Sequence, residues 1–123
     1  MKALCLLPAL IHIYIFILES FRWQHPRTRK VFAMSESQAE QTKLMAFNQG
    51  FYNLFLALGV IGAYALSFSV DYTQASLALG IFSNLSIIGA GLVLLASGRH
   101  LWRGALIQIV PALLSLALFV FAG

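Results

Sequence analysis

Charged residues are scarce in this sequence. They make up 10% of the 123 residues, and hydrophobic residues make up 60%, whereas soluble domains carry about a quarter charged residues. Four windows of about 18 residues or more contain almost no charge, which is roughly the helical length needed to cross the hydrocarbon core of a bilayer. A soluble chain of this size is too small to bury four such segments. The composition therefore excludes a soluble domain and predicts an integral membrane protein with the lipid bilayer as its partner.

Several chemical signatures are also absent. The single Cys5 cannot form a disulfide within the chain and is interpreted as a small buried hydrophobic residue. The three His residues are too far apart in the sequence for a metal site, and no glycine-rich loop predicts a nucleotide site. No internal repeat indicates the inverted halves of a transporter. We therefore expect no metal and no cofactor, and the catalytic residues, if there are any, stay unknown.

The apolar windows predict an all-α membrane protein. They are continuous rather than alternating, which is typical of spanning helices and not of barrel strands. We predict one domain over residues 1–123, a four-transmembrane-helix bundle. Its spans lie at about 3–21, 44–68, 75–97 and 105–122. The first span resembles a signal peptide, but it contains His12 and Glu19 and lacks a small-x-small cleavage site, so we expect it to be retained.

Local signals refine the connections. Ser35 and Gln38 form the Ser-x-x-Gln pattern of a capping box, which predicts a helix that starts in water near Glu36. Pro26 is predicted to end the first helix, and residues 71–74 are predicted to form a short polar turn.

The third and fourth spans carry two further signals. Pro111 lies inside the fourth span, where it favours a kink because it removes a backbone donor. The small residues of the third span predict close helix contacts. These small residues are Gly80, Gly89, Ala90 and Gly91.

The basic residues predict the orientation. The connections after the first and third spans contain Arg22, Arg27, Arg29, Lys30 and Lys43, and then Arg99 and Arg103. The opposite side carries Lys2, and the connection between the second and third spans carries no basic residue. The positive-inside rule therefore places both basic connections in the cytoplasm and both termini outside. The net charge of +4 is explained by this topology, so we expect no nucleic-acid partner.

Polar side chains inside the predicted spans are the candidate site. Ionisable and amide groups are costly in a bilayer and usually face the bundle interior or a cavity. The candidate ligand-binding residues are His12, Glu19, Asn48, Gln49, Tyr52, Asn53, Asn84 and Gln108. His12 and Glu19 are separated by nearly two helical turns and point the same way. The matching depths of these residues predict a polar pocket in the cytoplasmic half, with Glu19 near its mouth and His12 at its base.

Each of these residues also has a structural interpretation. Asn84 and Gln108 can serve as packing contacts between helices, typically worth under about 1 kcal/mol each. Glu19 can reach the interface and pair with Arg22 or Arg99. His12 can remain neutral and donate to a neighbouring carbonyl group.

Two stretches of the sequence resemble a known family. The first is His12-x-Tyr14-Ile15-x-x-Leu18-Glu19-x-Phe21-x-Trp23, followed by Pro26-Arg27 and Lys30-x-Phe32; the second is Asn48-Gln49-Gly50-x-Tyr52-Asn53-x-Phe55-Leu56-Ala57. This pattern is similar to that of small bacterial four-helix membrane proteins known as domain of unknown function thirteen hundred and four. The resemblance covers nearly the whole chain. It implies the fold and the signature polar residues, but no settled activity.

A weaker resemblance is to the membrane-associated eicosanoid and glutathione metabolism proteins. It rests on Asn48 and on the stretch Tyr52–Ala57 in the second span. The resemblance implies a four-helix fold with the termini outside, a polar site in the cytoplasmic half and a trimeric homo-oligomer. However, Leu44 stands where that family has Arg and Phe51 stands where it has Glu, so the groups that would hold glutathione are partly absent.

Three functional hypotheses follow. The first is a protein of the bacterial inner membrane that binds a small lipophilic or amphiphilic molecule in the inner-half pocket. The second is a membrane enzyme of the glutathione-transferase type, with Arg99, Arg103 and Lys43 as cations for the carboxylates of the thiol. The third is a structural or assembly subunit whose small-residue third span is an interface. No motif decides whether the protein is an enzyme.

Overall fold

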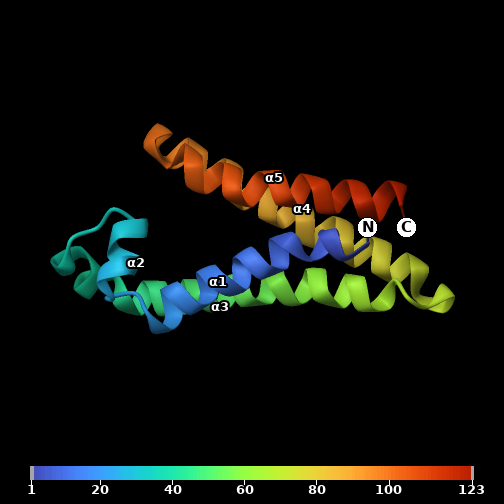
Figure 1. Cartoon of the computed structure of the whole chain (residues 1–123), viewed down its shortest axis with the longest axis horizontal. Helices are drawn as coiled ribbons and strands as arrows, with labels where there is room; N and C mark the ends of the chain where they lie inside the picture. The colour runs from blue at the N-terminus through green and yellow to red at the C-terminus, as the bar shows by residue number, and fades with distance from the viewer. Residues whose placement is uncertain (1, 123) are drawn as a thin grey trace. The chain divides into compact units, whose positions relative to one another are not determined.

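The computed structural model describes residues 2–122, and all regular structure among them is helical (Figure 1). The elements in chain order are η1 (Lys2–Leu6), α1 (Leu7–Phe21), α2 (Pro26–Val31), α3 (Glu36–Leu66), η2 (Val70–Tyr72), α4 (Thr73–Ser97), η3 (Arg99–Leu101) and α5 (Trp102–Phe121). Within residues 2–122, four helical segments are long and apolar enough to cross a membrane. They are Lys2–Phe21, Glu36–Leu66, Val70–Ser97 and Arg99–Phe121. The predicted fold class is confirmed in this respect: the chain is an all-α, multi-pass membrane protein.

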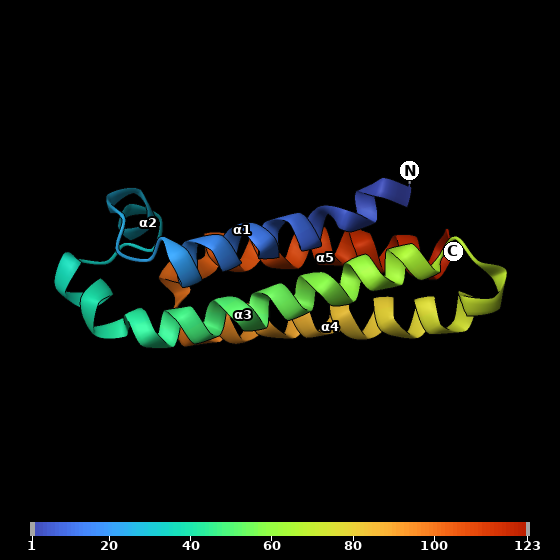
Figure 2. The ribbon, with the colours of Figure 1, turned by 90° about the horizontal axis from the view of Figure 1, so that it is seen from below.

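The capping box at the start of α3 is confirmed. The Gln38 backbone N–H donates to Ser35 Oγ at 3.1 Å, and the Ser35 backbone N–H donates to Gln38 Oε1 at 2.8 Å. These two bonds satisfy backbone donors that a helix start leaves free. The helix begins at Glu36, as predicted, and continues without interruption to Leu66 (Figure 2, green).

The prediction for Pro26 is wrong. The first helix ends at Phe21, and Pro26 instead opens the short helix α2 as its first residue. Proline suits this position because its fixed φ is helical and a first-turn residue needs no N–H donor. His25 caps the same helix, since its Nδ1 accepts the Arg27 backbone N–H at 3.2 Å. The connection that the sequence presents as a loop therefore contains a helix.

Two bonds and a left-handed residue end α2. The Met34 backbone N–H donates to the Arg29 carbonyl group at 3.0 Å, and the Ala33 N–H donates to the Lys30 carbonyl group at 3.3 Å. This is the Schellman pattern, whose left-handed position is usually a glycine. Here Ala33 occupies it, with φ 51°. The chain thereby turns from α2 into the capping box of α3.

The predicted polar turn at residues 71–74 lies a few residues earlier, at residues 67–72. The helix α3 ends at Leu66, and 3-10 helix η2 then leads directly into α4, which begins at Thr73. The Thr73 hydroxyl donates to the Val70 carbonyl group at 2.9 Å and satisfies an acceptor at this junction. At the second basic connection, which follows α4, the 3-10 helix η3 leads into α5. This helix begins at Trp102 and runs through Pro111 to Phe121.

The described residues fall into two compact units by their contacts. One unit comprises the described parts of Met1–Ile11 and Leu56–Gly123, and the other is His12–Phe55. In the first unit, α4 and α5 pack against each other, and α5 contacts η1. The Ser115 hydroxyl donates to the Cys5 carbonyl group at 2.9 Å, which links α5 to η1 through a buried hydrogen bond.

Glycines bring α4 close to α5 within one chain. A Cβ atom at Gly80 would lie 2.8 Å from Cγ of Phe119, and one at Gly91 would lie 2.5 Å from Cγ1 of Ile109. Both distances are too short for real carbon contacts, so these positions allow the helix approach that small residues make possible. The small residues of the third span are therefore explained in part by packing inside the chain. A larger residue at Gly80 or Gly91 would consequently test folding before it tested any assembly.

Candidate functional site

A buried carboxylate–amide pair connects α1 and α3 in the unit His12–Phe55. The Asn53 side-chain Nδ2 donates to Glu19 Oε1 at 2.8 Å and to the Gln49 carbonyl group at 3.2 Å. Glu19 and Asn53 are each only 8% exposed. Buried polar groups with hydrogen-bond partners are tolerated, whereas unpartnered ones are costly. Two of the predicted site residues are thus brought together, although 34 positions separate them in the sequence.

A close approach of the two helices makes this pair possible. A Cβ atom at Gly50 would lie 2.0 Å from Ser20 Oγ and 3.1 Å from the Phe16 carbonyl oxygen. Glycine is thus the residue that lets α1 pass this part of α3. The Ser20 hydroxyl donates to the Phe47 carbonyl group at 2.9 Å and fastens the contact. The Phe16 and Phe51 rings pack edge to face beside it, with centroids 5.0 Å apart.

An open groove of about 630 Å³ lies at the end of this helix pair. It is lined by Glu19, Ser20, Phe21, Arg22, Trp23, Gln24, His25, Lys43, Leu44 and Phe47. The lining combines a buried carboxylate, two cationic side chains and large apolar groups. Within His12–Phe55, Arg22 forms no ion pair with Glu19.

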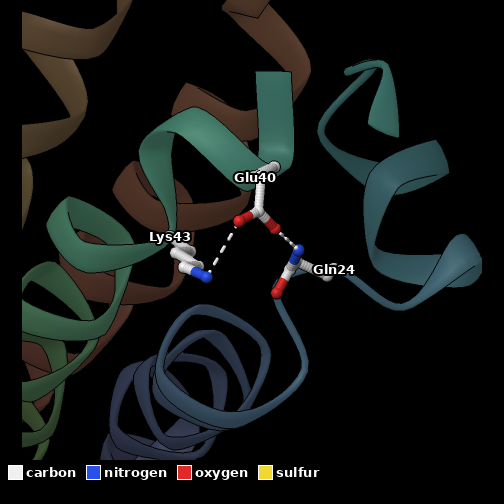
Figure 3. Close-up of polar contacts among 3 residues, drawn as sticks. All are labelled: Gln24, Glu40 and Lys43. Atoms are coloured by element: carbon white, nitrogen blue, oxygen red, sulfur yellow. Dashed lines mark hydrogen bonds and ion pairs between the residues drawn. The ribbon is translucent and has the colours of Figure 1, made fainter. Parts of the chain in front are cut away.

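A small polar network holds the groove's edge (Figure 3). One Glu40 carboxylate oxygen accepts a hydrogen bond from Lys43 Nζ at 2.9 Å, and the other accepts one from Gln24 Nε2. The Trp23 indole Nε1 donates to Thr42 Oγ1 at 3.0 Å; Thr42 lies in α3, as do Glu40 and Lys43. These bonds join the segment after α1 to the first turns of α3. They fix the positions of Trp23, Gln24 and Lys43, all three of which line the groove.

Three of the predicted site residues contribute no side chain to the Glu19–Asn53 pair. The side chains of Asn48, Gln49 and Tyr52 are exposed, and Tyr52 has 59% of its surface accessible. Gln49 contributes its backbone carbonyl group and not its amide. The sequence could place these residues on one helix, but it could not tell which of them faces α1.

The remaining predicted residues are His12, Asn84 and Gln108. His12 belongs to the same unit as Glu19, and its side chain is fully buried. Asn84 and Gln108 belong to the other unit. Each amide donates to a carbonyl group one turn earlier in its own helix, Asn84 to Gly80 at 2.8 Å and Gln108 to Gly104 at 3.4 Å. Both bonds lie within a single helix, so the contact between helices expected for these amides stays a prediction.

The sequence missed most of the groove. Ser20, Gln24 and Phe47 carried no recognised signal, and Trp23 appeared only in the pattern that carries the family resemblance. Their proximity depends on the turn after α1, which brings residues 22–25 beside the first turns of α3. Within residues 2–122, no group of three His, Cys, Asp or Glu side chains is placed to hold a metal ion. The side chains that line the groove can interact with a ligand through charge, hydrogen bonds and apolar contacts.

Comparison with known proteins identifies the family but no activity. The model of the family described as "Protein of unknown function (DUF1304)" matches residues 6–120. The chain belongs to this family. No curated protein and no solved structure is similar enough to the chain to count as a match.

Proposed function

We propose that this member of the DUF1304 family binds a small amphiphilic molecule with an anionic head in the groove at the end of α1 and α3. The observation that carries the proposal is the composition of this groove. Arg22 and Lys43 supply positive charge, and Leu44 and Phe47 supply apolar surface. Binding sites for small molecules typically combine apolar walls with a few placed polar groups. The head of the ligand would bind the cations, and its tail would lie along the apolar residues.

Glu19 and Arg22 both line the groove, and they differ in whether another protein side chain already binds them. Glu19 lines the groove, and its Oε1 is held by Asn53. Arg22 has no ion-pair partner within His12–Phe55, so its guanidinium group is available for the two-pronged hydrogen bonding that phosphate and carboxylate heads accept. Lys43 is shared with Glu40 and contributes as a second, weaker contact.

Native mass spectrometry of the full chain extracted in an uncharged maltoside detergent tests this proposal. We expect a retained adduct with dodecyl phosphate and none with dodecanol, which shares the tail but lacks the charge. Arg22→Gln should weaken the adduct at least about tenfold, a loss typical of one charge-assisted hydrogen bond. Arg27→Gln is the matched control, since Arg27 is exposed and does not line the groove.

Two results would count against the proposal. One is equal retention of the phosphate and the alcohol, and the other is equal loss in the two arginine variants. Glu19→Gln distinguishes the roles of the pair, because it keeps the oxygen that Asn53 binds but removes the charge. Tighter binding of dodecyl phosphate by this variant would show that Glu19 lies close to the anionic head and repels it. Loss of binding would show that the Glu19 carboxylate is needed.

We further propose that the groove faces the cytoplasm of a bacterial cell and that both termini lie outside. The basis is the positive-inside rule applied to the seven basic residues of the two basic connections. A C-terminal alkaline phosphatase fusion is expected to be active, and a C-terminal green fluorescent protein fusion is expected to be dark. A fluorescent C-terminal fusion would contradict the orientation and move the groove to the outer face. It would leave the binding experiment unaffected.

A further inference from the structure

A second cavity lies in the other compact unit, which comprises the described parts of Met1–Ile11 and Leu56–Gly123. Its volume is about 240 Å³. Its polar lining residues are Lys2, Tyr64, Ser67, Thr73 and Ser76, and Phe119 is among its apolar ones. None of these residues lines the groove described above. An engineered apolar cavity of roughly 150 Å³ holds a benzene molecule, so this cavity has room for one ring and a short chain.

Three of the four side-chain hydroxyl groups in the lining, all except that of Tyr64, donate hydrogen bonds within the protein. Ser67 Oγ donates to the Tyr64 carbonyl group at 2.6 Å, and Ser76 Oγ donates to the Ala63 carbonyl group at 2.7 Å. Thr73 Oγ1 donates to the Val70 carbonyl group at 2.9 Å. A hydroxyl group that has given its proton away retains lone pairs. These three oxygens can therefore accept hydrogen bonds from a ligand but cannot donate to it.

Lys2 supplies the complementary group. Its ammonium group carries three donors and no acceptor, and its Nζ lies 5.8 Å from the centroid of the Phe68 ring. The cavity thus offers three accepting oxygens, one cationic donor and the Tyr64 phenol hydroxyl group, which can donate or accept, beside apolar walls. A ligand that both donates and accepts one hydrogen bond matches this set. A carboxylate could pair with Lys2, but it has no hydrogen to donate to the three accepting oxygens.

We propose that this cavity binds a small, largely apolar molecule with one neutral hydroxyl group, of the size of an alkylphenol. The hydroxyl hydrogen would be donated to one of the three oxygens of Ser67, Thr73 and Ser76. The hydroxyl oxygen would accept from Lys2, and the ring would contact Leu118 and Phe119. This site is independent of the proposed amphiphile groove, so either proposal can fail while the other stands.

Photoaffinity labelling of the full chain in lipid nanodiscs tests the inference. The probe is a phenol with a diazirine on its alkyl chain, and the inserted residues are mapped by mass spectrometry. We expect saturable insertion into the cavity residues and displacement by 4-propylphenol. Propylbenzene should displace the probe about fivefold less well, which is the effect of one net hydrogen bond. The carboxylate analogue 4-propylbenzoate should be weaker than 4-propylphenol as well.

Two variants locate the site. Leu118→Trp should abolish the displaceable labelling because the larger ring fills the cavity. Leu114→Trp is its control, since Leu114 lies one turn earlier on α5, is 42% exposed and does not line the cavity. Thr73→Val preserves shape, removes one of the three accepting oxygens and should narrow the difference in affinity between 4-propylphenol and propylbenzene. This second variant tests the proposal even if Leu118→Trp fails to fold.

Three outcomes would overturn the inference. The first is labelling that is spread over lipid-facing residues and not displaced by excess 4-propylphenol. The second is labelling that is unchanged in both Leu118→Trp and Thr73→Val. The third is displacement by 4-propylbenzoate that exceeds displacement by the phenol, which would replace the neutral hydroxyl with an anion as the recognised group.

Discussion

Replacing Gly50 with leucine is expected to prevent α1 and α3 from packing in the unit His12–Phe55. The first side-chain carbon would lie 2.0 Å from Ser20 Oγ and 3.1 Å from the Phe16 carbonyl oxygen. Ser20 can rotate away only by giving up its hydrogen bond to the Phe47 carbonyl group, and the Phe16 oxygen is part of the backbone. Overpacking typically costs 1–3 kcal/mol and occasionally more. We expect Gly50→Leu to lower the free energy of unfolding by more than about 3 kcal/mol. A titration with dodecyl sulfate measures this free energy.

The chain offers a matched control and a rescue for this prediction. Gly89 lies in α4, and a Cβ atom there would have no heavy atom within 4 Å, so Gly89→Leu should leave the free energy of unfolding nearly unchanged. Gly50→Ala should destabilise by roughly 1–3 kcal/mol, and the added change Ser20→Gly should recover part of that loss. Equal stability of Gly50→Leu and Gly89→Leu would show that the helices do not approach each other at Gly50.

Asn53→Leu is the second change with a large expected effect. It removes the donor that holds Glu19 Oε1 at 2.8 Å and leaves a buried carboxyl group without that partner. Leaving a buried polar group without its hydrogen-bond partner costs about 1–3 kcal/mol, and more when the group is charged. We expect a decrease of at least about 2 kcal/mol in the free energy of unfolding. The same titration with dodecyl sulfate measures it, with Tyr52→Leu as the exposed neighbour on the same helix.

A double substitution distinguishes this hydrogen bond from simple packing. In Glu19→Met with Asn53→Leu both partners become apolar, which is often nearly neutral when shape is kept. The double variant should therefore be more stable than Asn53→Leu alone. Additive destabilisation by the two changes would show that the pair is not coupled.

The sequence determined the class of the protein through free energies that act locally. Long uncharged windows specify spanning helices because each backbone group must be satisfied within the helix when no water is present. The capping box at Ser35 could also be predicted from the sequence, because its two partners are only three residues apart. The family resemblance stated from the residues is confirmed by the match over residues 6–120. None of these inferences requires knowledge of which helix faces which.

Only the tertiary structure decided which polar residues form the candidate site. Asn48, Gln49, Tyr52 and Asn53 point in several directions around one helix, and the position of α1 buries Asn53 while its neighbours remain exposed. The sequence also did not predict that Gly50 allows α1 to approach α3, because such an approach depends on the atoms of the partner helix. Pro26 was misread because proline both stops a helix and begins one, and the outcome depends on the turn before it. Contacts between distant residues involve many alternative pairings, and packing selects among them.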